Sequence, residues 1–325
     1  MFSKRIFQHH SEASFEELAL EIFRFQAGEN KVYAEFLQLL DRDPGKVSRL
    51  EEIPFMPIEF FKSRDVVSAT SPVEKTFLSS GTTGAEQSRH LVTDLKLYEK
   101  SFVRGFELFY GPVDQYTILA LLPSYLEREG SSLIYMVDHL IGMSGSSDSG
   151  FYLHDLPGLR QRLLQLDAEK RKVLLLGVSY ALLDLLEAGP LHLNHTLIME
   201  TGGMKGRRRE MVKEELHQVL RSGFGLKDIH SEYGMTELLS QAYSRGEGLF
   251  ETPPWMKVLI REPEDPFAYA VYGKTGGINV IDLANVNSCS FIATQDLGRS
   301  YGNTCFRVMG RFDQSDIRGC NLMVV

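Results

Sequence analysis

Short apolar runs alternate with amphipathic segments through the middle of the sequence, and this alternation constrains the fold more than any other feature. Each apolar run has the length of a buried strand and follows a segment with helical spacing. We expect strands at 173–176, 196–199 and 228–231, preceded by helices at 156–166, 180–187 and 208–220. This order predicts an α/β protein with a parallel-rich sheet flanked by helices. Ligands of such sheets bind beyond the carboxyl ends of the strands, so the residues there are candidate site residues.

The regions on either side extend this pattern. Residues 1–50 read as a helical leader, with a capping box at 14–17 and a second helix at 32–40. Two prolines within 53–62 predict an extended segment there. Further strands are expected at 74–78, 89–93 and 116–122, with helices at 94–110 and 130–141. A β-rich part covers 240–310, with strands at 250–260, 269–271 and 276–283.

Polar segments that contain glycine follow two of the predicted strands. The first carries Gly202, Gly203 and Met204, and the second carries Tyr233, Gly234, Thr236 and Glu237. A tyrosine ring offers a flat face, a threonine offers a hydroxyl, and a glutamate offers a hard oxygen ligand for a metal. Taken alone, each segment also reads as an ordinary turn after a strand.

A cluster of hydroxyls and glycines lies between the predicted strands at 74–78 and 89–93. Its residues are Ser79, Ser80, Gly81, Thr82, Thr83 and Gly84. Backbone N–H groups and hydroxyls in such a loop can surround the oxygens of a polyphosphate. It is not a Walker A loop, because the Lys-Ser/Thr pair of that pattern is missing. The alternative is a polar hairpin turn.

This cluster resembles the phosphate loop of the adenylate-forming enzymes, which include acyl-CoA synthetases, adenylation domains of peptide synthetases and luciferases. Within that superfamily, the segment 53–62 resembles the LuxE-type acyl-protein synthetases. The segment from Tyr233 to Glu237 resembles the second nucleotide motif, and the segment 202–204 the adenine-side loop. Asp296 resembles the ribose-binding aspartate, and the segment 310–313 resembles the hinge motif. These motifs occur in the superfamily's order.

The resemblance implies a role for each matching residue. Tyr233 would lie against adenine, Thr236 would meet the α-phosphate, and Glu237 would help to hold Mg²⁺. The carboxylate of Asp296 would accept both ribose hydroxyls, Arg311 would contact ribose, and Asp313 would be the hinge. Two departures accompany the match. Gln295 stands where glycine is usual, and the lysine of the first loop is missing, with Arg89 as its candidate substitute.

The resemblance also implies the domain organisation. Residues 1–310 would form the large N-terminal domain of the adenylate-forming fold, with parallel-rich sheets, flanking helices and a small β-barrel-like subdomain. Residues 311–325 would be a hinge-like stub. The mobile C-terminal lid domain, which in relatives brings a lysine to the α-phosphate, is expected to be absent.

Composition narrows the range of partners and compartments. The net charge of -8 argues against a nucleic-acid partner, which would require a basic face. The three cysteines, at 289, 305 and 320, have neither a disulfide framework nor zinc-site spacing. No apolar run approaches the roughly 20 residues that span a bilayer. Together with the absence of a signal peptide, this predicts no integral membrane segment and a cytoplasmic location.

The implied activity is ATP- and Mg²⁺-dependent conversion of a carboxylic acid, for LuxE-type proteins a fatty acid, into acyl-AMP and pyrophosphate. The acyl group would then pass to a thiol on a protein. Cys320 is the candidate acceptor and a catalytic residue on that view; an idle cysteine is the alternative. Two other functions stay open: an acyl- or aryl-CoA ligase, and a non-catalytic adenylate-binding protein that lacks the lid lysine.

Overall fold

The computed structural model describes residues 2–68, 71–80, 86–123, 128–202, 208–209, 211–302 and 304–312. Within these ranges, twelve strands form one mixed sheet. Its parallel part runs in the order β5 (Gly150–Phe151), β4 (Thr117–Leu121), β6 (Val173–Val178), β7 (Thr196–Thr201) and β8 (His230–Tyr233). Every residue of β4 and β6 is buried, as expected for strands covered on both faces. The prediction of an α/β fold with a parallel-rich sheet is confirmed.

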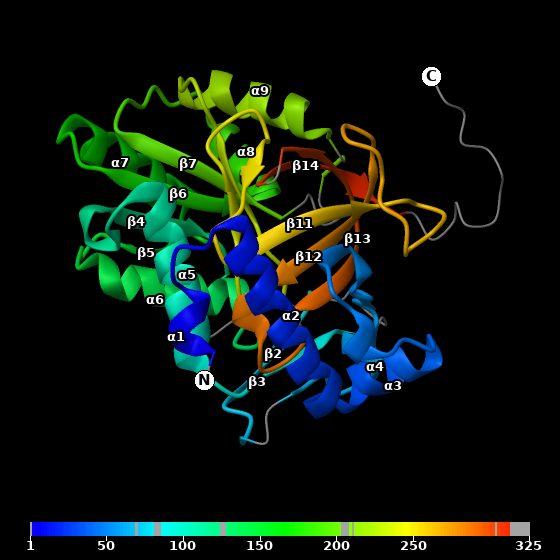
Figure 1. Ribbon diagram of the computed structural model, residues 1–325. Helices are drawn as coiled ribbons and strands as arrows, with labels where there is room; N and C mark the ends of the chain where they lie inside the picture. Colours follow the sequence, from blue (N-terminus) through cyan, green and yellow to red (C-terminus); the bar gives the residue numbers. More distant parts are fainter. Residues whose placement is uncertain are drawn as a thin grey trace.

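Helices cover both faces of the parallel part (Figure 1). On one face lie α7 (Leu156–Ala168), α8 (Ser179–Leu186) and α9 (Lys213–Phe224), and on the other lie α5 (Leu95–Tyr110) and α6 (Ser132–Ser144). The chain order reverses at β4, whose neighbours are β5 and β6. Helix α9 begins five residues later than predicted. Arg208 lies outside it because its guanidinium pairs with Asp184 of α8.

The β-rich part joins the parallel strands through β9 (Ala242–Ser244), which runs antiparallel to β8. The remaining strands are β10 (Phe250–Glu251), β11 (Met256–Arg261), β12 (Gly276–Asp282), β13 (Phe291–Tyr301) and β14 (Cys305–Arg311). They follow in the order β10-β14-β13-β12-β11 and are hydrogen-bonded to the parallel strands through β9.

Two strand predictions in this part are wrong in detail. The single strand expected at 250–260 is divided into β10 and β11, because Pro253 and Pro254 lack the N–H that a ladder requires. The strand expected at 269–271 is reduced to an isolated bridge between Arg261 and Tyr269.

The N-terminal helices pack against the β-rich part. They are α1 (Ser3–Ile6), α2 (Glu12–Glu29) and α3 (Lys31–Leu39), followed by the 3-10 turns η1 (Pro44–Lys46) and η2 (Leu50–Glu52). The capping prediction is wrong by one turn: the Ser11 side chain accepts from the Ser14 amide and begins α2. Gln26 of α2 donates to the carbonyl of Val286 at 2.9 Å, which fixes α2 against the segment before β13.

The proline-containing segment is extended only in part. Its β1 (Met56–Pro57) pairs in parallel with β13, as an extended segment held against the core should. Helix α4 (Phe60–Ser63) then follows, because the chain after Pro57 contains no further proline and the Phe61 amide turns back to the Ile58 carbonyl.

A two-stranded hairpin stands apart from the large sheet. Its strands are β2 (Lys75–Leu78) and β3 (Arg89–Val92), close to the predicted bounds. Beyond the strands, the Ser79 amide donates to the Ser88 carbonyl at 3.0 Å, which extends the pairing toward the hydroxyl cluster. Two further 3-10 turns, η3 (Val113–Gln115) and η5 (Leu283–Asn285), connect other elements.

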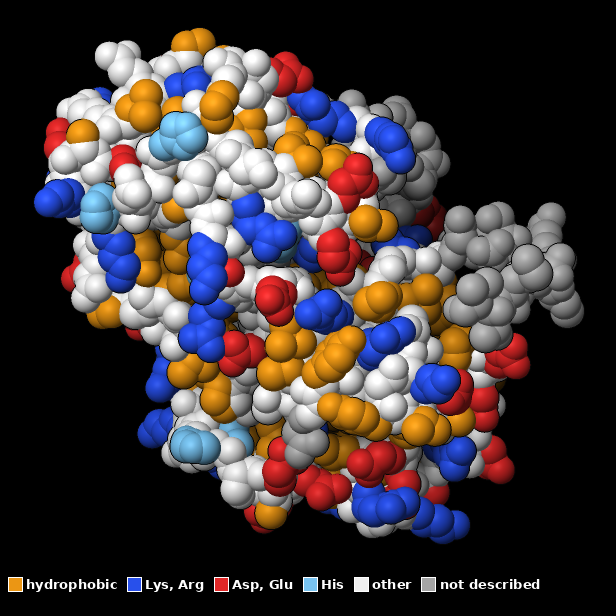
Figure 2. Space-filling model, turned by 90° about the horizontal axis from the view of Figure 1, so that it is seen from above, with side chains coloured by type: hydrophobic (Ala, Val, Ile, Leu, Met, Phe, Trp, Pro, Cys, Tyr) orange, Lys and Arg blue, Asp and Glu red, His pale blue; other side chains and the backbone are white. Residues whose placement is uncertain are grey.

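The surface carries charges of both signs. Figure 2 shows acidic and basic side chains interspersed over one face of the molecule, with apolar side chains between them. No helix in the described ranges is both long enough and apolar enough to cross a membrane.

Candidate functional site

Tyr233 and Asp296 lie together, although their strands β8 and β13 are not neighbours in the sheet. Tyr233 is the last residue of β8, and its hydroxyl donates to Asp296 Oδ2 at 2.9 Å. Arg311, at the end of β14, approaches the other carboxylate oxygen at 3.3 Å. Burial raises the pKa of Asp296, while the Tyr233 hydroxyl and the Arg311 charge oppose that shift. Three predicted nucleotide residues therefore form one cluster.

The ring of Tyr233 is largely buried. It packs edge-on against Phe306, with ring centroids 5.3 Å apart, and against Phe250 at 5.8 Å. Burial, with the negative charge of Asp296 beside it, holds the pKa of Tyr233 well above its ordinary value, so the hydroxyl stays a hydrogen-bond donor. Gly234 follows directly and continues the chain toward Thr236.

The Thr236–Glu237 segment contacts the hairpin that carries the hydroxyl cluster. His90 Nδ1 lies 2.8 Å from the Thr236 carbonyl oxygen. Ser88, two residues earlier in the hairpin, bonds the Glu237 carboxyl through its side chain. Because residues two apart in an extended strand face the same side, Ser88 and His90 present one surface to the segment. The hairpin that carries the first predicted motif therefore contacts the second motif.

Glu237 is 5% exposed. Burial raises its pKa, the Ser88 hydrogen bond opposes that rise, and the charges of Arg311 and Lys62 are its weakest influences. A divalent cation beside this carboxylate would supply the positive charge that it otherwise receives only from a distance. No group of three or more His, Cys, Asp or Glu side chains suited to a metal occurs in the described part of the chain. The Glu237 carboxylate has the hard oxygen donors that Mg²⁺ prefers and would supply one ligand to that ion.

The phosphate-loop residues are described only at their beginning. Ser79 Oγ accepts from the Ser88 amide at 2.9 Å, and the Ser79 carbonyl accepts from the Gln87 side chain at 2.9 Å. Ser80 is exposed. The rest of the cluster and several other predicted residues lie outside the described residues: Gly81, Thr82, Thr83, Gly84, Gly203, Met204, Asp313 and Cys320.

Arg89 does not join the cluster. Its guanidinium pairs with Asp65 at 3.1 Å, and the side chain is 46% exposed. Alternation along β3 directs it away from the side that His90 and Ser88 present to Thr236 and Glu237. The substitution of Arg89 for the missing phosphate-loop lysine stays a prediction, because residues 81–85 of that loop lie outside the described residues.

Gly202 directly follows β7 and has a positive φ of 66°, a conformation that glycine adopts without strain. Its carbonyl accepts from the Ser179 hydroxyl at 2.8 Å. The backbone at the predicted adenine-side loop is thus held by the first residue of α8.

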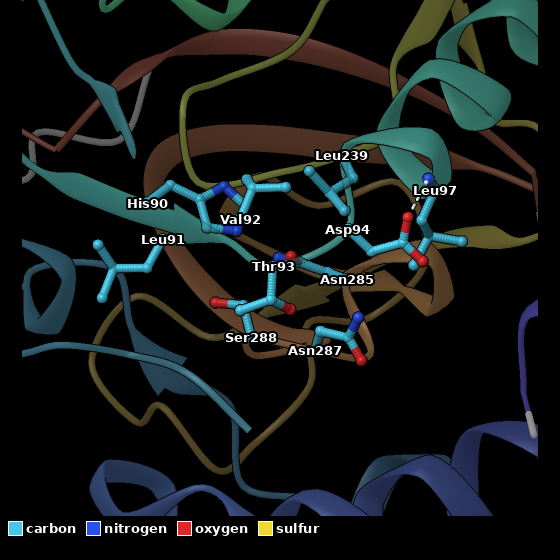
Figure 3. A pocket seen from close by; sticks show the side chains of 10 residues that line it. All are labelled: His90, Leu91, Val92, Thr93, Asp94, Leu97, Leu239, Asn285, Asn287 and Ser288. Atoms are coloured by element: carbon cyan, nitrogen blue, oxygen red, sulfur yellow. Dashed lines mark hydrogen bonds between the residues drawn. The ribbon is translucent and has the colours of Figure 1, made fainter. Parts of the chain in front are cut away.

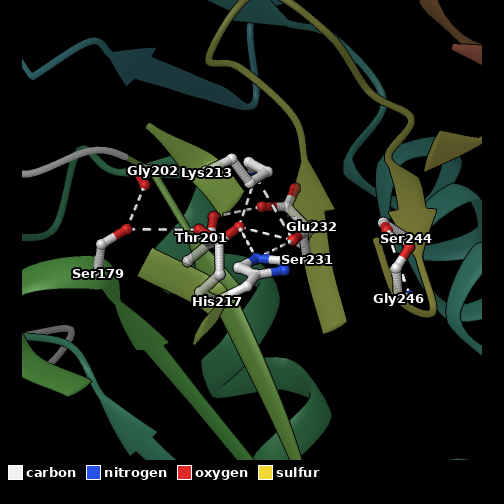
Figure 4. A network of polar contacts seen from close by, with 10 residues as sticks. Ser179, Thr201, Gly202, Lys213, His217, Ser231, Glu232, Ser244 and Gly246 are labelled. Atoms are coloured by element: carbon white, nitrogen blue, oxygen red, sulfur yellow. Dashed lines mark hydrogen bonds and ion pairs between the residues drawn. The ribbon is translucent and has the colours of Figure 1, made fainter. Parts of the chain in front are cut away.

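A buried polar network lies behind these strand ends, and the sequence analysis missed it (Figure 4). Glu200 of β7 is 2% exposed and pairs with Lys213 Nζ at 2.5 Å. It also accepts from the Ser231 hydroxyl at 2.6 Å and lies 3.4 Å from His217 Nε2. Burial alone would raise the pKa of Glu200, but these partners lower it to about 2.

The neighbouring strand carries a second buried carboxyl with the opposite shift. Glu232 of β8 accepts from the Thr201 hydroxyl at 2.5 Å. Burial, reinforced by the negative charge of Glu200, raises the pKa of Glu232 to about 7. The two carboxyls therefore differ in protonation near neutral pH. The i, i+4 spacing of Lys213 and His217, together with a glutamate after an apolar run, is the signal that could have revealed this network.

The sequence matches no family model and no curated protein. Solved structures do resemble it. ATP-bound MatB from Rhodopseudomonas palustris superposes with a TM-score of 0.56 at 18% identity, covering 75% of this chain and 49% of MatB. A second similar structure is 2-hydroxyisobutyryl-CoA ligase in an open conformation, in complex with 2-HIB-AMP and CoA. It superposes with a TM-score of 0.63 at 14% identity, covering 93% of this chain and 75% of the ligase chain.

The same ligase in its thioesterification state gives a TM-score of 0.64 at 15% identity, covering 94% of this chain and 70% of the ligase. The chain thus spans about half the length of MatB and about three quarters of the open-state ligase chain. The finer resemblance to LuxE-type proteins stays a prediction. The chain has the α/β fold of the N-terminal domain of the adenylate-forming acyl-CoA ligases.

Proposed function

We propose that the protein activates a carboxylic acid with ATP, releasing pyrophosphate, and passes the acyl group to a thiol. Two sets of contacts made by the segment 233–237 support this proposal: one with the hairpin that carries the hydroxyl cluster, and one with Asp296. The hairpin residues Ser88 and His90 contact the Thr236–Glu237 segment, and Tyr233 in turn bonds Asp296. A polar turn without a ligand gives no reason for one segment to make both sets of contacts.

In the first half-reaction, a carboxylate oxygen bonds to the α-phosphorus of ATP. The bond between that phosphorus and the bridging oxygen breaks, and pyrophosphate leaves. Thr236 would donate its hydroxyl to the α-phosphate, and the loop that begins at Ser79 would donate to the β- and γ-phosphates. Bringing two anions together requires charge neutralisation and fixed geometry, which these donors would provide.

Magnesium, held through Glu237, would supply positive charge at the phosphate oxygens. The cluster of Tyr233, Asp296 and Arg311 would make the remaining contacts with the nucleotide. Its carboxylate, oriented by Tyr233 and Arg311, would accept from the ribose hydroxyls. The resemblance implies that the ring of Tyr233 lies against adenine. In the structure this ring packs against Phe250 and Phe306 and is 8% exposed.

In the second half-reaction, a thiolate sulfur bonds to the acyl carbon and AMP leaves. The resemblance to LuxE-type proteins favours a fatty acid as substrate and a protein thiol as acceptor, with Cys320 as the candidate. A CoA ligase is the second candidate, because a neighbour in structure was solved with CoA bound. Replacing Cys320 by Ser separates the two, since it should abolish self-acylation and leave transfer to CoA intact.

The test is ATP–pyrophosphate exchange with Mg²⁺ and a panel of carboxylic acids of increasing chain length. We expect exchange that depends on one class of acid and on Mg²⁺. Release of AMP on addition of CoA would identify the CoA ligase, and covalent labelling of the protein would identify the acyl-protein type. ATP binding by calorimetry without exchange for any acid would overturn catalysis and leave the adenylate-binding protein.

A further inference from the structure

The two consecutive carbonyls of Thr236 and Glu237 are each held by a buried side chain. His90 of β3 lies 2.8 Å from the Thr236 oxygen. Asn285 of η5 donates through Nδ2 to the Glu237 oxygen at 2.7 Å and to the Cys289 oxygen at 2.9 Å. His90 and Asn285 are 1% and 0% exposed. The segment that carries the candidate phosphate and metal contacts is therefore fixed through its backbone.

The chemistry of the histidine ring determines which atoms can donate. A carbonyl oxygen only accepts, so His90 Nδ1 carries the hydrogen that bonds Thr236. Burial lowers the pKa of His90 to about 4, against the Thr236 and Asn285 hydrogen bonds, and keeps the ring neutral at physiological pH. Nε2 of a neutral ring is then an acceptor, and it cannot donate to the side-chain oxygen of Asn285.

A small cavity lies beside these two residues (Figure 3). Its volume is about 10 Å³, and Thr93, Ser288 and Leu239 also line it. Thr93 Oγ1 and Asn285 Oδ1 are buried and have no hydrogen-bond partner among the protein atoms described. The volume is near the smallest that holds one water molecule, and a buried water needs two to four polar partners.

We propose that one internal water in this cavity joins Thr93, His90 and Asn285, and that these residues position the Thr236–Glu237 segment for nucleotide chemistry. The water would accept from the Thr93 hydroxyl and donate to Asn285 Oδ1 and His90 Nε2. Thr93 Oγ1 and Asn285 Oδ1, which have no hydrogen-bond partner among the protein atoms described, are then satisfied. The positioning role rests on the proposed function, whereas the water site does not.

The surroundings of Asn285 support a positioning role. Its backbone carbonyl accepts from Gln26 of α2 at 3.1 Å, and the next carbonyl, of Val286, accepts from the same amide group. On the other side, the Phe61 ring of α4 packs edge-on against His90, with centroids 5.6 Å apart. Contacts from α2 and α4 thus help to hold Asn285 and His90 in place, so that their hydrogen bonds can fix the position of the segment.

The test uses two substitutions that keep the shape of the side chain. Thr93→Val removes the hydroxyl from the cavity without touching the segment, and His90→Phe removes both ring nitrogens but can keep the packing against Phe61. Thr196→Val is the matched control, because Thr196 Oγ1 is likewise buried without a partner but lies at the start of β7. Each variant is studied as the full chain, with thermal unfolding to establish that it folds.

The first measurement is amide hydrogen exchange, which needs no activity. The Leu238 amide donates to the Met235 carbonyl at 3.1 Å and reports on this segment. We expect its exchange to accelerate about fivefold or more in Thr93→Val and His90→Phe, as loss of one buried hydrogen bond predicts, and to stay unchanged in Thr196→Val. A high-resolution crystal structure should show one water between Thr93 and Asn285.

The second measurement is the Mg²⁺ dependence of pyrophosphate exchange. Both variants should need about fivefold more Mg²⁺ for half-maximal exchange, with little change in the KM for the acid. Unchanged Leu238 exchange in Thr93→Val, or a cavity without water density, would overturn the water site. Accelerated amide exchange with an unchanged Mg²⁺ requirement would overturn the positioning role. If the wild type shows no pyrophosphate exchange, the proposed function and the positioning role fail, and the amide and crystallographic results still decide the water site.

Discussion

The hydroxyl of Tyr233 bonds the carboxylate of Asp296 at 2.9 Å across 63 residues of sequence. The bond ties the end of the parallel strand β8 to the long antiparallel strand β13. A residue matched to the adenine motif thereby orients a residue matched to the ribose motif. Tyr233 and Asp296 can be tested separately by substitution. When the Tyr233 hydroxyl is removed, the Asp296 carboxylate still has Arg311 as a second partner.

Tyr233→Phe should weaken ATP binding about fivefold, since it removes one hydrogen bond to the carboxylate and leaves the ring in place. Asp296→Ala should weaken binding more than tenfold, because the ribose acceptor itself is lost. Calorimetry with a non-hydrolysable ATP analogue measures both. Tyr301→Phe is the matched control, as Tyr301 lies at the far end of β13. Wild-type affinity in Asp296→Ala would remove it from the ribose site.

Glu237→Gln keeps the shape of the side chain and removes its charge. Pyrophosphate exchange should fall roughly 100-fold, and extra Mg²⁺ should restore part of it, because removal of one charged ligand or transition-state donor costs on the order of 3 kcal/mol. In Thr236→Ala, pyrophosphate exchange should fall by a similar factor, and extra Mg²⁺ should not restore it. The exposed Glu247→Gln serves as the control. Full activity in both loop variants would contradict the assignment of this segment.

Glu232 should make stability depend on pH. Because its folded pKa is raised from 4.5 to about 7, the unfolded chain ionises first, and stability falls as the pH rises between those values. The loss should approach about 3 kcal/mol, taking about 1.4 kcal/mol for each pH unit. Urea denaturation of wild type and Glu232→Gln from pH 4 to pH 8 measures it. The stability of Glu232→Gln should not fall with pH in this way, whereas the control variant, with the exposed Glu215→Gln substitution, should behave like wild type. If the stability of wild type and of Glu232→Gln changed in parallel with pH, Glu232 would ionise normally.

Lys213→Met should destabilise the protein by roughly 3 kcal/mol at pH 7, because Glu200 would stay buried without its closest cation. The contribution of Glu200 to folding stability changes with pH in the opposite direction to that of Glu232. Since the folded pKa of Glu200 is lowered to about 2, its stabilisation is present above 4.5 and is lost as the pH falls toward 2. The deficit of Lys213→Met should therefore narrow in acid, and adding Glu200→Gln should recover part of it. An equal deficit at pH 3 and pH 7 would refute the ion-pair explanation.

The sequence predicted the central strands well, because their short apolar runs follow directly from burial within the sheet. The apolar runs of β4, β6 and β7 are buried on both faces, so their sequence shows them directly. Helix starts were less certain, because Ser11 and Ser14 both have the chemistry of a cap and only the surrounding fold selects Ser11. The motif loops were found since each follows a strand that could be recognised.

What the sequence could not show are contacts between distant residues of ordinary character. His90 and Asn285 lie 195 positions apart in the sequence, and neither stands in a recognisable pattern. Arg89 was singled out for its charge, and its ion pair with Asp65 could not be read from the sequence. Only the fold decides which neighbour along a strand faces the site.

The pairing of α2 and β1 with the segment 285–293 has a consequence for synthesis on the ribosome. Gln26 finds its partners about 260 residues later, and Met56 pairs with Ile292. The first sixty residues therefore leave the ribosome long before the strand that completes their packing exists. Contacts of such separation form late and slowly. Until then the apolar faces of α2 and α3 are exposed, and a chaperone that shields nascent chains would act first on this leader.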